Sequence, residues 1–402
     1  MQGTIEERTV KRGRDANGKM RSNMKVYDVR YRYTDPETGK RKTTRKRGFL
    51  RRADAEAFLL KVNQEESDGI VVHHQALLMK DYLTDWMETY VKNNLRATTY
   101  EGYEFDVKNH LIPHLGKYEI KRLTASDIDK FYAHLRQNGR RDGKGGLAEI
   151  SLKRVHRILS QALKHAVKHN LIARNPVDGV INTPRPKKFT PDIYDDQEIV
   201  KLMQMAKGTL FEVPIVLGGI CGLRRGEILG LQETDIDFER RCIRISHQLV
   251  EVRKELLFTA PKSQDSNRTI SAPALVFDIL SRRIEYNRRN KALLQGDYHD
   301  HGLIVCCDNG MPLSPKNFSA RFCNLLKRLK IKRVRFHDLR HSGASMMLRA
   351  GVDMKVVSSI LGHSSIKITA DVYLHILEEM KLDAAAKVEN LIEKALDNME
   401  QN

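Results

Sequence analysis

Alternating charged and apolar side chains mark the first part of the chain. Within residues 25–34 (KVYDVRYRYT) they alternate with the period of two that is typical of a half-buried β-strand. Residues 35–40 (DPETGK) predict a turn from their Asp-Pro and Gly content, and a second, basic strand follows over 41–49. Over 52–64 the apolar spacing changes to three and four residues, which predicts a helix. We therefore expect a small basic sheet with a helix behind it.

Residues 78–180 show the spacing of amphipathic helices throughout. Thr124 to Asp127 forms a capping-box motif at the start of the third helix, and the glycine-rich stretch 139–146 predicts a connection before the fourth. The four apolar stripes, which we expect to pack together, contain Leu83, Trp86, Met87 and Tyr90; Tyr100, Tyr103, Val107 and Leu111; Ile128, Phe131, Tyr132 and Leu135; and Leu152, Val155, Ile158, Leu159 and Leu163.

The last part of the chain predicts a mixture of helices and strands, entered through a linker that contains prolines at 184, 186 and 191. A helical start is followed by a strand over 242–250, a hairpin over 255–273 and further helices. The tail, 376–402, keeps helical spacing but carries seven Asp and Glu against three Lys. An acidic helix is a poor ligand for DNA, so its apolar face is expected to pack on protein, either its own domain or a neighbouring subunit.

The charge of the chain indicates a polyanionic partner. Its 402 residues contain 70 Lys and Arg against 51 Asp and Glu, a formal net charge of +19. Residues 1–52 alone hold 17 Lys and Arg and 6 Asp and Glu. Nucleic acid is the usual partner for such a surplus, although a solvated basic arm without specificity would show the same composition.

The cysteines and the apolar runs exclude other classes of protein. The five cysteines are odd in number and form no CxxC pair, so they predict neither a disulfide framework nor a zinc site. The N-terminus lacks an apolar signal segment, and the longest nearly apolar run, 213–223, is too short to span a bilayer. A cytoplasmic protein in contact with bacterial DNA is the expectation.

Four stretches carry the residues that metal-free cleavage of a DNA phosphodiester would need. Such a reaction requires cations on the non-bridging oxygens, a nucleophile and an acid for the 5′-oxygen. The stretches are CGLRRGE (221–227), TAPKSQDSNR (259–268), FHDLRH (336–341) and LGHSSIKIT (361–369), the last followed by Tyr373. Taken singly, each has an ordinary interpretation: a basic helix elbow, a solvated hairpin tip, a polar helix face, and one of 13 tyrosines.

Together the four stretches resemble the tyrosine recombinase family, whose order Arg, Lys, His-x-x-Arg, His, Tyr is present in full. The resemblance extends over residues 78–380 at least. The resemblance implies that Arg224 and Arg340 clamp the scissile phosphate, where a planar guanidinium pairs bidentately with the oxygens. It also implies that Glu227 supports the site. Arg225 fits less well, because the motif position aligns with Arg224.

The remaining motif residues would carry the proton and bond transfers. The resemblance implies that Lys262 protonates the departing 5′-oxygen and that His337 and His363 assist proton transfer and charge stabilisation. Tyr373 would be the nucleophile that forms a 3′-phosphotyrosyl link. Such a link preserves the energy of the broken bond, so neither ATP nor a metal or other cofactor is expected, and the chain contains no P-loop motif.

The same resemblance implies a three-domain fold. Residues 1–70 would form a small α+β arm-type DNA-binding domain, 78–182 an all-α core-binding domain, and 190–402 a mainly α catalytic domain with a small β-sheet and an exchange helix over 376–402. The arm-domain residues expected to contact DNA are Arg30, Arg32, Lys42 and Arg45.

The function that follows is a site-specific integrase of a mobile element from a phage or a conjugative element. It would act as a homotetramer on core and arm DNA sites through a Holliday junction, with an excisionase and DNA-bending proteins as possible partners. A type IB topoisomerase, which uses similar residues as a monomer, and a non-catalytic DNA-binding protein are the alternatives. The capture of a covalent DNA adduct separates the second of these from an enzyme.

Overall fold

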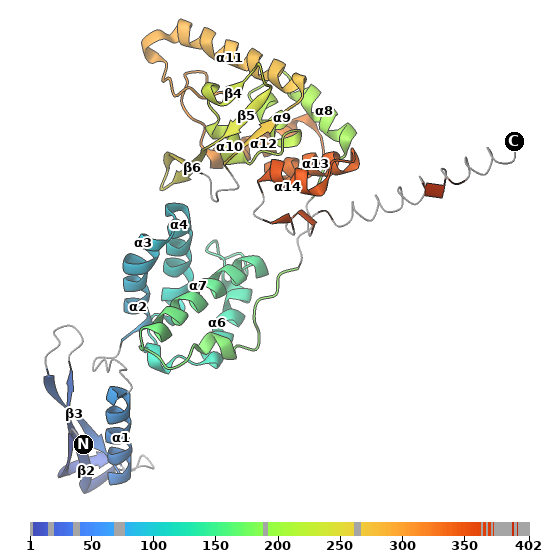
Figure 1. Ribbon diagram of the computed structural model, residues 1–402. Helices are drawn as coiled ribbons and strands as arrows, with labels where there is room; N and C mark the ends of the chain where they lie inside the picture. Colours follow the sequence, from blue (N-terminus) through green and yellow to red (C-terminus); the bar gives the residue numbers. More distant parts are fainter. Residues whose placement is uncertain are drawn as a thin grey trace. The chain divides into compact units, whose positions relative to one another are not determined.

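The computed structural model shows the predicted classes of domain (Figure 1). The described residues are 3–14, 20–34, 41–67, 77–187, 192–260, 267–362, 365, 366, 369, 370, 373, 388, 389 and 392. The chain divides into two compact units, Met1–Lys187 and Lys188–Asn402. A small sheet with one helix and an all-helical bundle belong to the first unit, and a mainly helical body with two small sheets forms the second. The predicted fold class is confirmed.

The N-terminal body is a three-stranded antiparallel sheet covered by one helix. The strands β1 (Gly3–Arg14), β2 (Met20–Thr34) and β3 (Arg41–Phe49) lie in the order β1-β2-β3, and α1 (Arg52–Ser67) follows. The predicted strands and helix are confirmed, whereas β1 was missed because its polar sequence lacks a clear alternation. The predicted turn at 35–40 lies outside the described residues. The small core of this body contains Val29, Tyr31, Ala55, Leu59 and Val62.

The two faces of this sheet differ in chemistry. The register pairs Arg30 with Arg45, and Arg32 lies two residues along β2, so these three arginines share the face opposite α1. Lys42 is paired with Tyr33 and therefore lies on the face that α1 covers. All four basic side chains are exposed to solvent. Of the four predicted residues, the three arginines therefore share one face of the sheet and Lys42 does not.

The helical body consists of four long helical segments, two of which contain a π-helical turn. The first runs through α2 (Met79–Trp86), η1 (Met87–Val91) and α3 (Lys92–Asn94), and the second through α4 (Ala97–Asp106), η2 (Val107–Leu111) and α5 (Ile112–Leu115). The others are α6 (Ala125–Asn138) and α7 (Glu149–Lys168), with short 3₁₀ turns η3 (Ile120–Arg122) and η4 (Pro176–Gly179). The capping box at Thr124 is present, and the predicted stripes form one core in which Tyr90 is only partly buried.

The C-terminal body is built of helices around two small antiparallel sheets. Its helices are α8 (Asp196–Ala206), α9 (Glu212–Gly219), α10 (Arg225–Gly230), α11 (Ala274–Leu294), α12 (Pro315–Leu329), α13 (Phe336–Arg349) and α14 (Met354–Leu361), with 3₁₀ turns η5 (Glu233–Asp235) and η7 (Gln295–Asp297). One sheet has the order β4-β5-β8 and consists of β4 (Ile236–Asp237), β5 (Cys242–Ile245) and β8 (Arg268–Ser271). The other sheet pairs β6 (Gln248–Val252) with β7 (Glu255–Thr259).

The strands on either side of Lys262 do not pair with each other, contrary to the predicted hairpin over 255–273. β7 pairs with β6, and β8 pairs with β5 in the other sheet. The turn between β6 and β7 places Arg253 and Lys254 at positive φ, 49° and 71°, where glycine or asparagine is usual. Because the turn contains neither glycine nor asparagine, the sequence pattern did not indicate it. Lys262 follows β7 and precedes β8 in the sequence, and it lies outside the described residues.

Close packing of α13 on α9 sets the relative position of the two main motif segments. The two helices are in contact, and a β-carbon at Gly343 of α13 would overlap the carbonyl oxygen of Gly219. Phe336, at the start of α13, stands edge-on to Phe318 and Phe322 of α12 at centroid distances of 4.9 and 5.1 Å. A glycine crossing and an aromatic cluster thus hold α13 firmly against the core.

Candidate active site

The first motif segment is the turn from α9 into α10. Helix α9 is buried almost throughout, and it ends because Gly222 adopts a left-handed conformation, with φ of 66°. The Leu223 N–H then donates to the Leu217 carbonyl at 3.0 Å. This turn delivers Arg224 to the N-terminal cap of α10, while the neighbouring Arg225 turns to the Ser319 hydroxyl of α12.

A buried carboxylate holds two arginines. Glu227 is 2% exposed; the Arg224 backbone N–H and Nη1 donate to it at 2.9 and 2.7 Å, and the Arg268 guanidinium donates at 3.1 and 3.3 Å. Burial alone would raise the pKa of Glu227, but the charges and hydrogen bonds of Arg268 and Arg224 outweigh it, so the pKa lies below its ordinary value. Glu227 therefore remains an anion that orients both guanidinium groups.

The second motif segment is the first turn of α13. His337, Arg340 and His341 are spaced by three and four residues, so they share one helix face. Arg340 is 2% exposed and donates from Nη1 to the Gly222 carbonyl and from Nη2 to the Leu361 carbonyl, both at 2.6 Å. Burial and the nearby Arg224 lower the pKa of Arg340 to about 9, so it still carries its charge at neutral pH.

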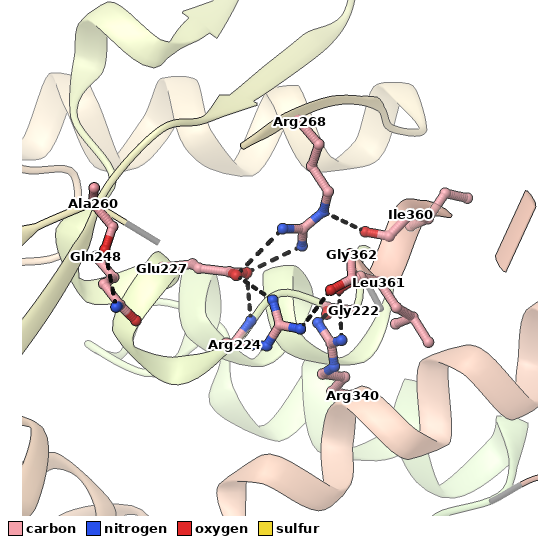
Figure 2. Close-up of polar contacts among 10 residues, drawn as sticks. All are labelled: Gly222, Arg224, Glu227, Gln248, Ala260, Arg268, Arg340, Ile360, Leu361 and Gly362. Carbon is pink, nitrogen blue, oxygen red and sulfur yellow. Dashed lines mark hydrogen bonds and ion pairs between the residues drawn. The ribbon is translucent and has the colours of Figure 1, made fainter. Parts of the chain in front are cut away.

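Three guanidinium groups meet the C-terminal end of α14 (Figure 2). Arg268 donates to the carbonyl of Ile360 at 2.6 Å, Arg340 to that of Leu361, and Arg224 to that of Gly362 at 2.7 Å. Free carbonyls at a helix C-terminus carry partial negative charge, which favours cations there. The three side chains come from three separate segments of the chain, and the end of α14 is their common anchor.

Tyr373 lies in the same site. Its side chain is 1% exposed, packs in a cluster with Ala344, Leu348, Val357 and Leu361, and has its hydroxyl 2.9 Å from His341 Nδ1. Burial raises the pKa of Tyr373 well above its ordinary value, although the charge of Arg340 opposes the shift. The tyrosine is therefore protonated at neutral pH, and its hydroxyl lies within the field of a clamp arginine.

His337 is exposed to solvent and contacts His341, the partner of the tyrosine. Its ring meets that of His341 edge-on, at a centroid distance of 5.2 Å. Although the side chain keeps access to solvent, burial of part of the ring, with His341 and Arg340 beside it, lowers the pKa of His337 to about 4. Before DNA is bound, His337 is a neutral imidazole that can exchange a proton with water.

Five of the seven residues predicted for the catalytic site come together, namely Arg224, Glu227, His337, Arg340 and Tyr373. Lys262 and His363 lie outside the described residues, between Ala260 and Asn267 and directly after Gly362 respectively. Two members of the site were missed: Arg268, the second partner of Glu227, and His341, the partner of Tyr373. The four-residue spacing of His341 from His337 was a signal that could have found it.

The described part of the chain contains neither a metal-binding cluster nor a membrane-spanning helix. Among these residues, no group of three or more His, Cys, Asp or Glu side chains is placed to hold a metal ion. None of the helices built from them is long and apolar enough to cross a membrane. All five cysteines are free thiols.

Three family models match successive parts of the chain. An arm DNA-binding domain matches residues 18–65, the SAM-like N-terminal domain of phage integrases matches 78–136, and the phage integrase family matches 194–380. Each match falls on one of the three bodies of the fold. The third spans the site residues from Arg224 to Tyr373.

Known proteins resemble this chain along most of its length. A tyrosine recombinase XerC-like protein of Caldanaerobacter subterraneus is 26% identical over 342 residues, 81% of this chain and 86% of that protein, and the ICEBs1 integrase of Bacillus subtilis is 26% identical over 73% and 78%. The integrase of transposon Tn1549, solved with a circular intermediate DNA, shares the fold with a TM-score of 0.61 at 21% identity, covering 76% of this chain and 99% of that one. The lambda integrase tetramer on a Holliday junction aligns with a TM-score of 0.51 at 19% identity, covering 88% and 96%. The chain therefore belongs to the phage integrase family and is a tyrosine-type site-specific recombinase, an enzyme that cleaves and rejoins DNA.

Proposed function

We propose that the chain integrates and excises a mobile genetic element, and that Tyr373 attacks the scissile phosphate in a site formed by its own catalytic domain. The observation that carries the proposal is the convergence of the Arg224 and Arg340 guanidinium groups with the Tyr373 hydroxyl. The names of its relatives support the biological setting, since they include the ICEBs1 integrase and the integrase of Staphylococcus phage L54a.

The arginines act as a preformed clamp. Arg224 and Arg340 use part of their donor sets on backbone carbonyls, and a guanidinium carries five N–H donors, so other donors remain for the non-bridging oxygens of a phosphate. Glu227 keeps Arg224 in place and remains charged itself. Such fixed donors stabilise the negative charge on the non-bridging oxygens without reorganising during the reaction.

Proton transfer completes the chemistry. Lys262, on the segment between β7 and β8, protonates the departing 5′-oxygen, and His337 and His363 stabilise charge and pass protons. His363 follows Gly362, whose carbonyl accepts a hydrogen bond from Arg224, so the anchor of the clamp stands next to it in the chain. The product is a 3′-phosphotyrosyl link on Tyr373, and attack by a 5′-hydroxyl reverses it.

Each domain has a different task on the DNA. Residues 1–70 bind arm-type sites through Arg30, Arg32 and Arg45, which share the open face of the sheet, residues 78–182 bind the core site, and 190–402 carry catalysis. Residues 376–402 form a helix that docks on a neighbouring subunit of a tetramer. Val388, Glu389 and Ile392 of this segment are helical, and the side chains of Val388 and Ile392 are each 55% exposed, which leaves them available for such docking. An excisionase and DNA-bending proteins are further partners.

Covalent trapping tests the proposal. On a nicked suicide substrate, the full-length protein should form an adduct that survives SDS and maps to Tyr373 by peptide analysis. Tyr373→Phe should bind the same DNA without forming the adduct, because it lacks the nucleophilic oxygen. An adduct of undiminished yield in the variant would exclude Tyr373 as the nucleophile.

A sulfur substitution tests the role of Lys262. A substrate with sulfur in place of the 5′-bridging oxygen has a leaving group that needs no acid. Lys262→Ala should therefore be strongly defective on the oxygen substrate and close to the parent protein on the sulfur one. Equal defects on both substrates would make Lys262 a DNA-binding residue only.

A further inference from the structure

The contact between His341 and Tyr373 is not used by the function proposed so far. The tyrosine hydroxyl lies 2.9 Å from His341 Nδ1, and their ring centroids are 5.9 Å apart. His337, to which proton transfer was assigned from the sequence, contacts the ring of His341. Within the described part of the chain, the ionisable side chain at the tyrosine hydroxyl is thus His341.

We propose that His341 is a catalytic residue, the general base that accepts the phenolic proton as Tyr373 attacks phosphorus. The inference rests on the proposed function, because Tyr373 must be the nucleophile. As the tyrosine oxygen forms its bond to phosphorus, the O–H proton moves to Nδ1 and the bond from phosphorus to the 5′-oxygen breaks. The 5′-oxygen leaves with a proton from the acid, Lys262. In the rejoining step the 5′-hydroxyl attacks, and His341 returns its proton to the departing tyrosine.

Before attack, each group is in the protonation state that this transfer requires. Burial lowers the pKa of His341; the Asp338 carboxylate opposes the shift, and the guanidinium groups of Arg340 and Arg335 reinforce it. The imidazole is therefore neutral at pH 7, and in the tautomer protonated at Nε2 its Nδ1 accepts a hydrogen bond. Tyr373 keeps its proton until attack, because burial raises its pKa, so its reaction needs a base within reach.

The position of His341 also provides a route for the proton to leave. The base is partly buried, whereas His337 is one helical turn away, touches its ring and is exposed to solvent. A proton taken up by His341 can be passed through His337 or a water molecule to bulk solvent. The two histidines then have different tasks: His341 takes the proton from tyrosine, and His337 lies at the outer end of the path.

A variant that keeps the hydrogen bond but removes the basicity tests the assignment. His341→Gln can still accept a hydrogen bond from the tyrosine through its amide oxygen, but it cannot take the proton. We expect it to slow adduct formation on the suicide substrate by about 10²- to 10⁴-fold, the range of general acid–base catalysis. Melting temperature and core-site affinity should match the parent protein. His341→Asn is the second variant if the glutamine protein does not fold.

Replacing Tyr373 by 3,5-difluorotyrosine, introduced at that one codon, gives a readout that a merely structural role would not move. The fluorinated phenol is more acidic and depends less on a base. In the His341→Gln background, cleavage with the fluorinated tyrosine should be at least about tenfold faster than with tyrosine. The matched control His337→Gln should gain less from the same replacement. The cleavage rate of His341→Gln should also keep rising with pH, because the tyrosine must then lose its proton to solvent.

Three outcomes would overturn the assignment. A His341→Gln protein as fast as the parent would reduce His341 to a positioning residue. A folded but slow variant that gains nothing from the fluorinated tyrosine would exclude a role as base. Equal or greater rescue of His337→Gln would place the base at His337 instead. Since the residual adduct on Tyr373 is measured in every case, failure of this inference is distinct from failure of Tyr373 as the nucleophile.

Discussion

Arginines are used in two different ways in this molecule. On the N-terminal sheet, Arg30 and Arg32 project into solvent from the face opposite α1. In the catalytic body, Arg268 and Arg340 have side chains that are 8% and 2% exposed and are held by a carboxylate and by backbone carbonyls. The residue type is the same, but one pair is exposed to water and the other is desolvated and held by hydrogen bonds.

The difference shows what each surface can contribute. An exposed guanidinium gains little from any single contact and is screened by salt, so it supplies long-range attraction to DNA. A buried one has already lost its hydration and its conformational freedom during folding, so it can meet the charge of a transition state without further cost. Binding strength should therefore reside in the first set and rate in the second.

The largest expected effect is a loss of DNA cleavage rate when a buried arginine is replaced. Arg340→Ala should slow adduct formation by about 10³-fold or more, because it removes a fixed cation from the phosphate. Arg340→Lys keeps the charge but cannot donate to the Gly222 and Leu361 carbonyls with one planar fork, so it should remain strongly defective. Single-turnover cleavage measures both. A lysine variant near full activity would mean that charge alone suffices and that the fixed geometry is dispensable.

A smaller effect, on stability, is expected at Arg268. Arg268→Leu leaves Glu227 buried with Arg224 as its remaining partner, and breaking a buried pair in this way costs up to about 3 kcal/mol. The double variant Arg268→Leu with Glu227→Leu should recover much of the loss, because the buried carboxylate is then removed together with its partner. Urea denaturation of the two proteins gives the comparison. A double variant less stable than the single one would show that Glu227 stabilises the fold through other contacts.

The next effect in size is a difference between the two regions in how stability depends on pH. The pKa values of His337 and His341 are lowered in the folded state, so between these values and about 6.5 the unfolded chain binds protons that the folded chain does not. The stability around α13 should therefore fall as the pH drops below about 6.5 and stay level above it. Residues 1–70 contain no histidine, and their sheet should be unaffected down to about pH 5.

Thermal proteolysis at pH 7.5 and 5.5, followed peptide by peptide with mass spectrometry, resolves the two regions in the full chain. The peptides of α13 should become susceptible at a lower temperature in acid, and those of β2 should not. Equal shifts in both regions would indicate a general effect of net charge.

The smallest effects are expected on the N-terminal sheet. Arg30→Ala and Arg32→Ala should leave cleavage of a core substrate unchanged and should each reduce the salt dependence of arm-site binding by about one phosphate contact. Lys42→Ala is the matched control, since Lys42 lies on the face covered by α1. Fluorescence anisotropy over a range of salt concentrations measures all three. An equal change in the control would place the DNA on an edge of the sheet rather than on its open face.

Periodic patterns made much of the fold predictable from sequence. The stripes of 78–180 and the alternation of 25–34 mark elements whose burial follows directly from residue spacing, and both are confirmed. The two strands on either side of Lys262 are present, but their pairing as one hairpin was predicted wrongly. The choice of partner strand depended on the turn at Arg253 and Lys254, whose positive φ angles are enforced by the surrounding structure rather than by residue type.

The residues of the candidate site that belong to short sequence motifs could be predicted, and the others could not. Arg224, Glu227, His337 and Arg340 stand in motifs with recognisable spacing, and the structure brings them together. Arg268 could not be assigned from sequence, because its role depends on Glu227 and Ile360, 41 and 92 residues away. The partner of Tyr373 likewise lies 32 residues from it and on a different element. Contacts at such separations leave no local pattern.

The anchoring of Arg224 on the Gly362 carbonyl, 138 residues away, also bears on how the protein is made. Contacts of high sequence separation close late in folding, and a chain folds domain by domain as it leaves the ribosome. The helical body and the sheet can be complete while the C-terminal part is still being synthesised. A nascent or truncated chain that ends before α14 would thus engage DNA without a finished clamp. Because Arg224 is held by a carbonyl near the C-terminal end of the catalytic body, the protein can cut DNA only after that part of the chain has been synthesised.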